Sequence, residues 1–152
     1  MTLTIVGKDD LLSKVGQELG TSEWFVVTQE KVDQFAEATG DHQWIHVDPL
    51  KAAGGPFGGT VAHGYFTLSL APALFWQIVT VEGVKMGVNY GSNKVRFISP
   101  VKVGKRVRLK ATLLTAEALE PNSVQATYNM VFEIEDEKRP ACVGEIVTRY
   151  YF

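Results

Sequence analysis

The stretch from Gly64 to Val79, Gly-Tyr-Phe-Thr-Leu-Ser-Leu-Ala-Pro-Ala-Leu-Phe-Trp-Gln-Ile-Val, is apolar at nearly every position and decides the fold. A helix that is apolar all round is buried on several faces, so this segment is expected at the centre of the molecule. Pro72 should kink the helix or begin a second segment of it, because proline lacks a backbone N–H. Thr67, Ser69 and Gln77 interrupt the run, which favours a core helix over a membrane span.

Segments that alternate between polar and apolar residues follow this helix. Such alternation predicts strands with one solvent-facing side and one buried side. Together with the helix they predict an α+β fold, in which an antiparallel sheet of about five strands covers the helix. The alternating segments are Asn93–Ile98, Arg106–Ala111 and Val124–Phe132, with a last strand at Ala141–Tyr151 and turns at Val103–Lys105, Glu120–Ser123 and Glu135–Pro140.

The residues before the central helix predict shorter elements. Thr28 is expected to cap a helix over residues 29–39, and Gly40 to end it, because threonine and glycine suit those two positions. Asp48-Pro49 should begin a helical turn that runs to Ala53. A short helix is also expected over residues 9–15, and a short strand over residues 24–27.

Composition limits the class of protein. The length of 152 residues predicts a single domain over residues 1–152. The net charge of -2 gives no electrostatic footprint for DNA or RNA. The lone Cys142 excludes an internal disulfide and a cysteine-based zinc cluster, and is expected to be an inert packing residue. The first ten residues lack the pattern of a signal peptide, so a cytoplasmic location is expected.

Asp41 and His46 lie five residues apart, just beyond the predicted helix end at Gly40. A carboxylate can accept a proton from water, and an imidazole can hold or deliver one near neutral pH. The pair therefore suits the addition of water to a polarised carbonyl compound. The structural alternative is that Asp41 caps a loop and His46 is a hydrogen-bonded, half-buried residue.

His63 and Gly64 stand where the central helix begins. A glycine there can leave its backbone N–H bare, with no side chain to block a ligand. That N–H could hold the oxygen of a thioester as negative charge develops on it. The simpler alternative is that Gly64 permits close packing and that His63 bonds to the backbone.

A zinc site is a weaker alternative. The run from His42 to His46, His-Gln-Trp-Ile-His, imitates the two-histidine zinc helix, but Gln43 stands where a metalloprotease needs a glutamate. No third ligand is evident beside these histidines, so no metal is expected.

Seven basic residues fall within seventeen positions and are expected on the solvent-facing sides of strands. The alternative is that a few of them bind the phosphates of an acyl carrier. These residues are Lys94, Arg96, Lys102, Lys105, Arg106, Arg108 and Lys110. The aromatic residues Tyr65, Phe75 and Trp76 of the central helix are expected in the core rather than around a cofactor.

Residues 35–53 and 61–70 together resemble the MaoC-like dehydratases, the (R)-specific enoyl-CoA hydratases of hot-dog fold. Their hallmark is Gly-Asp-x-Asn-Pro-Ile/Leu-His-x-Asp, followed by a His-Gly that starts the central helix. Gln43-Trp44 replaces Asn-Pro, as in the nodulation-protein-N-like branch, and residues 95–104 resemble the family's later strand connection. The matching residues are Gly40, Asp41, Ile45, His46, Asp48, His63 and Gly64.

The resemblance implies a single hot-dog domain, with the sheet wrapped around the helix, and a homodimer that binds an acyl-CoA thioester at its interface. Asp41 and His46 would activate the water that adds to a trans-2-enoyl-CoA, giving the (R)-3-hydroxyacyl-CoA. The Gly64 N–H would polarise the thioester carbonyl, with His63 beside it in the substrate-binding site. No metal or other cofactor is implied. A thioesterase of the same fold and a non-catalytic acyl-CoA-binding module remain as alternatives.

Overall fold

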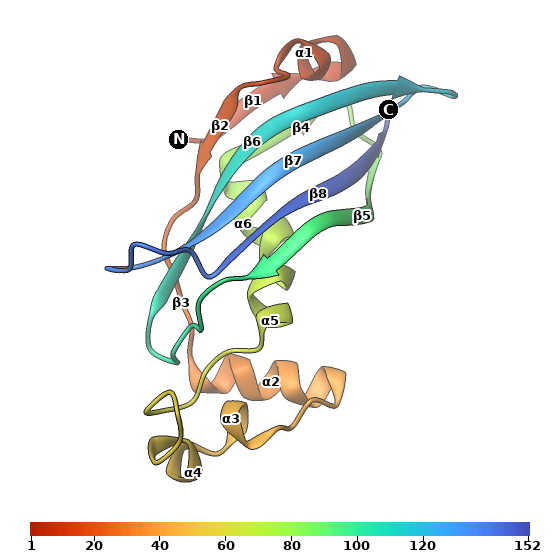
Figure 1. The fold of residues 1–152 in the computed structure, drawn as a ribbon. Coiled ribbons are helices and arrows are strands. Elements are labelled where there is room, and N and C mark those ends of the chain that lie inside the picture. The colour runs from red at the N-terminus through yellow and green to blue at the C-terminus, as the bar shows by residue number, and fades with distance from the viewer.

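A computed structural model describes residues 1–152 and consists of a curved antiparallel sheet around a pair of short helices (Figure 1). The order of the main strands is β2-β6-β7-β8-β5, and β3 also pairs with β6. This sheet confirms the predicted α+β arrangement. Its strands are β2 (Glu18–Thr21), β3 (Phe25–Val26), β5 (Met86–Phe97), β6 (Arg106–Leu119), β7 (Ser123–Ile134) and β8 (Cys142–Tyr151).

The central helix consists of two segments, α5 (Gly64–Ser69) and α6 (Ala71–Ile78), which lie against the concave face of the sheet (Figure 1). Pro72 is in the first turn of α6, where a missing N–H costs no helical hydrogen bond, so it begins a second segment as expected. The ring centroids of Phe75 in α6 and Tyr128 in β7 are 4.6 Å apart. The helix pair thus supplies the centre of the hydrophobic core.

Two expectations about burial are wrong. Tyr65 and Trp76 project from the helix pair with 67% and 71% of their surface exposed, whereas Phe75 is buried. Strand β5 is exposed along almost its whole length, instead of having one buried face. The reason is its position: β5 is at the edge of the sheet, paired only with β8, while α6 packs on β6, β4 and β2.

A second, two-stranded sheet was not expected. Strand β1 (Leu3–Val6) pairs in parallel with β4 (Val79–Glu82), and Leu3 lies opposite Val79. The apolar run therefore leaves the helix at Ile78 and continues as a strand. Helix α1 (Gly7–Ser13) follows β1 and corresponds to the short helix expected near residue 9.

Three helices lie beyond the N-terminal end of α5 (Figure 1): α2 (Gln29–Thr39), α3 (Trp44–Val47) and α4 (Pro49–Ala53). Thr28 Oγ1 accepts the N–H of Lys31, and Gly40 ends α2 with a left-handed φ of 84°, as predicted. Asp48 caps α4 by accepting the N–H of Lys51. These caps fix both ends of the segment that carries Asp41 and His46.

The outer face of the sheet carries ion pairs. Arg106 pairs with Glu135, and Arg108 with Glu133, between β6 and β7. Lys94 and Lys110 also have carboxylate partners. The expectation that the basic residues lie on the solvent-facing sides of strands is therefore confirmed for Arg106, Arg108, Lys94 and Lys110. None of the helices combines the length and apolar character needed to cross a membrane.

Candidate active site

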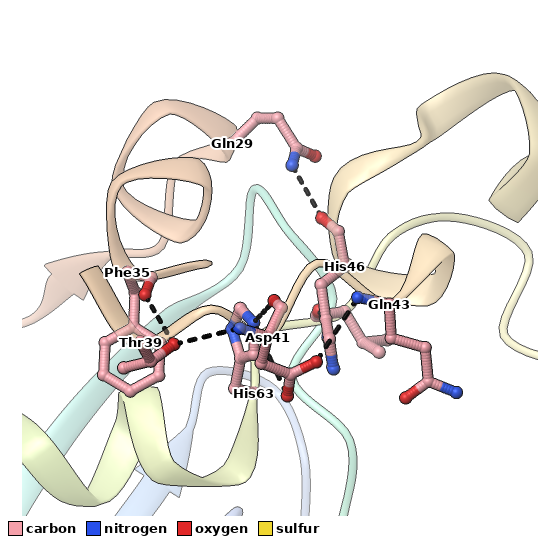
Figure 2. Close-up of polar contacts among 8 residues, drawn as sticks. Gln29, Phe35, Thr39, Asp41, Gln43, His46 and His63 are labelled. Carbon is pink, nitrogen blue, oxygen red and sulfur yellow. Dashed lines mark hydrogen bonds and ion pairs between the residues drawn. The ribbon is translucent and has the colours of Figure 1, made fainter. Parts of the chain in front are cut away.

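Three of the predicted site residues meet at the N-terminal end of α5 (Figure 2). Asp41 lies in the loop after α2, His46 in α3, and His63 immediately before α5. A carboxylate oxygen of Asp41 and one ring nitrogen of each histidine all lie within 4.8 Å of one another. The fold therefore joins the two sequence segments that were expected to form one site.

The ring of His46 is buried and fixed by one strong hydrogen bond. Its Nδ1 is 2.7 Å from the backbone oxygen of Val61. A carbonyl oxygen only accepts, so Nδ1 carries the hydrogen, and the Nε2 of the neutral ring presents a lone pair. The expectation of a hydrogen-bonded histidine is confirmed, and the same bond leaves Nε2 able to accept a proton or a hydrogen bond.

Gln29 holds the backbone of His46 in place, although no pattern in the sequence indicates this role. Its Nε2 donates to the backbone oxygen of His46 at 2.7 Å, and its Oε1 accepts the hydroxyl of Thr60 at 2.6 Å. Gln29 is the first residue of α2 and looks in sequence like any polar residue of a first helical turn. Only the folded chain brings it to α3 (Figure 2).

Asp41 is held through one carboxylate oxygen and leaves the other free. Oδ1 accepts the N–H of Gln43 at 3.3 Å, and the N–H of Asp41 donates to Thr39 Oγ1 at 3.4 Å. Oδ2 makes no hydrogen bond within the chain, and the side chain is 53% exposed. The loop-capping interpretation is therefore correct for Oδ1, while Oδ2 is available to water or substrate.

His63 is almost completely enclosed, with 3% of its surface exposed. Its Nε2 is 3.0 Å from the backbone oxygen of Asp41, which confirms the expected bond to the backbone. The ring stacks on His46, with centroids 3.8 Å apart, and its Nδ1 is buried without a hydrogen-bond partner. These contacts place His63 beneath the two residues expected to act on water.

Gly64 is the first residue of α5, and its N–H has no acceptor within the chain. The ring of Phe97 covers its Cα, because a Cβ added to Gly64 would lie 2.7 Å from Phe97 Cγ. The interpretation that Gly64 permits close packing is therefore confirmed. The N–H itself is still free to bind an oxygen.

The geometry of the histidines suits hydrogen bonding better than metal coordination. His42 does not belong to the cluster of Asp41, His46 and His63, and its Nε2 lies 3.7 Å from a carboxylate oxygen of Glu37. His63 and Asp41 do lie beside His46, so the expectation that no third ligand is near is wrong. However, Nε2 of His63, the nitrogen 4.0 Å from Asp41 Oδ2, donates to the backbone oxygen of Asp41 and so has no lone pair for an ion.

A separate cavity of about 620 Å³ opens between α6 and the sheet. Its lining includes Phe75, Trp76, Val81, Asn89 and Tyr150, and is mostly apolar. Tyr150 is one of the lining residues, and its hydroxyl is 2.7 Å from the hydroxyl of Tyr128. Burial raises the pKa of Tyr150 to about 12 and raises the pKa of Tyr128 as well.

Cys142 is buried in β8. Burial raises the pKa of its thiol to about 11, so it is held as the neutral, unreactive form. The expectation of an inert packing residue is confirmed.

Comparison with known proteins agrees with this geometry. Residues 10–133 match the family described as "MaoC like domain". The 3-hydroxyacyl-thioester dehydratase Z of Mycobacterium tuberculosis is 54% identical, over 93% of each chain. Nodulation protein N of Rhizobium leguminosarum is 47% identical, over 94% of this chain and 90% of its own. Among solved structures, the (R)-hydratase from A. caviae superposes with a TM-score of 0.67 at 25% identity, over 88% of this chain and 94% of its own.

Proposed function

The chain belongs to the MaoC-like domain family, and from this premise we propose that it is a hydro-lyase acting on enoyl thioesters. It would add water reversibly to a trans-2-enoyl-CoA and give the (R)-3-hydroxyacyl-CoA. The observation that carries this proposal is the free Oδ2 of Asp41 beside the buried His46, at the N-terminal end of α5. Two relatives, named as a 3-hydroxyacyl-thioester dehydratase and an (R)-hydratase, support the reaction and its stereochemistry.

The proposed reaction uses Asp41 and His46 on one water molecule. Oδ2 of Asp41 accepts a proton from the water, while Nε2 of His46 accepts a hydrogen bond from the other O–H. The hydroxyl adds to the β-carbon. The proton passes from Oδ2 of Asp41 to Nε2 of His46 and from there to the α-carbon, so both side chains return to their starting states. Neither step changes an oxidation state, so the proposed reaction needs no redox cofactor.

The backbone N–H of Gly64 would donate a hydrogen bond to the oxygen of the thioester carbonyl. Negative charge develops on that oxygen as water adds to the β-carbon, and a backbone N–H without another acceptor can stabilise it. The free N–H at the start of α5 supports this role. His63, which lies between this N–H and the Asp41 loop, would form the adjoining wall of the substrate-binding site.

The apolar cavity beside α6 supports an acyl substrate with a long tail. Gly64 begins α5 and Phe75 lines the cavity from α6, eleven residues further on, which is about 16 Å along a helix. A chain bound by its thioester at Gly64 could place its far end there. We therefore expect longer acyl chains to be better substrates than crotonyl-CoA.

The exposed edge of the sheet supports a homodimer. Met86, Val88 and Tyr90 of β5 are exposed, and β5 has no neighbour on its outer side. A bare, apolar edge strand is normally paired or covered, and a two-fold axis at β5 would join two sheets edge to edge. The exposed Tyr65 and Trp76 would then lie near the same contact. A cytoplasmic location stays a prediction from the sequence.

One assay separates the proposed hydratase from a thioesterase and from a binding module. The absorbance of a conjugated enoyl thioester is followed together with the release of free thiol, across a series of acyl lengths. Loss of absorbance without thiol release is the result expected here. Thiol release would identify a thioesterase, and binding without either change would identify a non-catalytic module.

A further inference from the structure

We propose that His63 is a positioning residue, which acts as a neutral imidazole with its hydrogen on Nε2 and fixes the Asp41 loop against His46. The inference rests on the proposed function of Asp41 and His46. It differs from the substrate-wall role, because it concerns what His63 does inside the protein. Three contacts carry it: the bond to the Asp41 backbone, the stack on His46 and the enclosed Nδ1.

The hydrogen-bond partners determine where the hydrogen of His63 lies. Nε2 is 3.0 Å from a backbone carbonyl oxygen, which can only accept, so Nε2 is the donor. A second hydrogen on Nδ1 would be a buried donor without an acceptor, and would put a positive charge against the ring of His46. The neutral Nε2–H tautomer is the one state in which every buried donor of the ring is bonded. The 4.0 Å approach of Nε2 to Asp41 Oδ2 is therefore not an ion pair.

The same contacts hold the ring in one orientation. His63 lies between His46 and the ring of Phe35, whose centroid is 4.9 Å away. These two neighbouring rings hold the imidazole in the orientation that presents Nε2 to Asp41. The two stacked histidines consequently hold opposite tautomers, with the hydrogen on Nδ1 in His46 and on Nε2 in His63.

Asp41 needs such support because its side chain is half exposed on a loop. The carbonyl bond to His63, together with the turn to Gln43, holds the Asp41 carboxylate beside the two histidines, with a carboxylate oxygen within 4.8 Å of a ring nitrogen of each. A loss of this bond would leave the carboxylate present but poorly aligned with the water. Misplacement of a reacting group by about 1 Å can cost about 10²-fold in rate.

Two variants separate the hydrogen bond from the stack. In His63→Gln the amide nitrogen can replace Nε2 as donor to Asp41, whereas His63→Phe keeps a ring against His46 but has no donor. We expect His63→Phe to lose about 10²-fold in kcat with little change in KM, and His63→Gln to stay within about tenfold of the original protein. Equal activity of the two variants, or an unimpaired His63→Phe, would overturn the proposal.

A measurement on the unaltered protein tests the tautomer directly and needs no turnover. Long-range ¹H–¹⁵N correlation spectra report which ring nitrogen carries hydrogen. The expected result is a protonated Nε2 and bare Nδ1 in His63, with the reverse in His46. A His63 ring with hydrogen on Nδ1 would overturn the proposal even if the enzyme is a hydratase. If the tautomers are as expected but the protein hydrates no enoyl thioester, the inference about His63 stands and the proposed function is refuted.

Discussion

The ring of Phe97 covers Gly64 so closely that any side chain at position 64 must displace it. A Cβ there would lie 2.7 Å from Cγ, in the part of the phenylalanine that is least able to move. Gly64→Ala should therefore lose about 1–3 kcal/mol of unfolding free energy, which is the usual cost of overpacking. Denaturant titration should show this loss, and Gly64→Ala/Phe97→Ala should recover most of it. An unchanged stability of Gly64→Ala would contradict the contact.

The role of the Gly64 N–H can then be tested in the Phe97→Ala background, where crowding is relieved. Proline fits the first position of a helix, and His63 has the extended ψ of 142° that a residue before proline needs. The Gly64→Ala and Gly64→Pro proteins in this background differ mainly in the N–H. We expect the Gly64→Pro protein to have about 10²–10³-fold lower kcat than the Gly64→Ala protein. Equal turnover would place the carbonyl-binding group elsewhere.

The dimer prediction concerns the outer edge of β5. Sedimentation equilibrium at micromolar concentration should give twice the mass of one chain. Val88→Glu places a charge on the exposed edge and should shift the protein toward one chain mass, with loss of activity. Leu114→Glu is the matched control, because Leu114 is an exposed apolar residue of β6, away from that edge. An active monomer, or a dimer unaffected by Val88→Glu, would contradict edge pairing.

The proposed reaction uses no metal, and so predicts that activity is indifferent to chelators. Nδ1 of His46 donates to the backbone oxygen of Val61, and Nε2 of His63 to that of Asp41, so these two nitrogens have no lone pair for an ion. Activity after dialysis against a strong chelator should equal that of the untreated protein. Activity lost on chelation and restored by zinc would show that the Asp41 cluster binds an ion.

Stability should fall in alkali because two phenols are buried. Burial raises the pKa of Tyr128, and raises that of Tyr150 to about 12, above the unfolded value of about 10. Both phenols are neutral when folded, so their stabilising contribution is complete below about pH 10 and is lost as the pH rises toward 12. The unfolding free energy obtained from urea titration should fall over this range by up to about 1.4 kcal/mol per pH unit per phenol.

The double variant Tyr128→Phe/Tyr150→Phe should show a weaker loss, and leaves no unpaired hydroxyl because both partners are removed. Tyr90→Phe removes an exposed phenol and should behave like the original protein. The buried thiol of Cys142 is present in every variant, so differences between the variants report the contribution of the phenols to the loss of stability in alkali. An equal alkaline loss in all three proteins would show that the buried tyrosines do not control it.

Local chemistry made part of this fold predictable from sequence. Thr28, Gly40 and Asp48 have side-chain or backbone preferences that specify caps without any distant partner, and all three occupy those positions. The apolar run from Gly64 identified the central helix for the same reason. The Asp41–His46 pair was predictable as chemistry, because its spacing lies within one loop and one helical turn.

Contacts between distant segments were not predictable in this way. The parallel pairing of Leu3 with Val79, the cover of Gly64 by Phe97 and the bond from Gln29 to His46 each need the finished fold. The alternation in β5 predicted a buried face, but alternation does not specify whether a strand is central or at an edge. The tautomer of His63 depends on a carbonyl 22 residues earlier in the chain and has no local signal.

The central claim is that Asp41 and His46 add water to an enoyl thioester, and Asp41→Asn tests it most directly. Asparagine keeps the oxygen that accepts the N–H of Gln43, so the half-exposed loop should fold as before, but it cannot accept a proton at the other position. In the combined absorbance and thiol assay, the original protein should consume the enoyl thioester without releasing thiol. Asp41→Asn, with an unchanged circular dichroism spectrum and assembly, should be slower by about 10²–10⁴-fold. A folded Asp41→Asn protein that retains more than about a tenth of the original rate would contradict the claim.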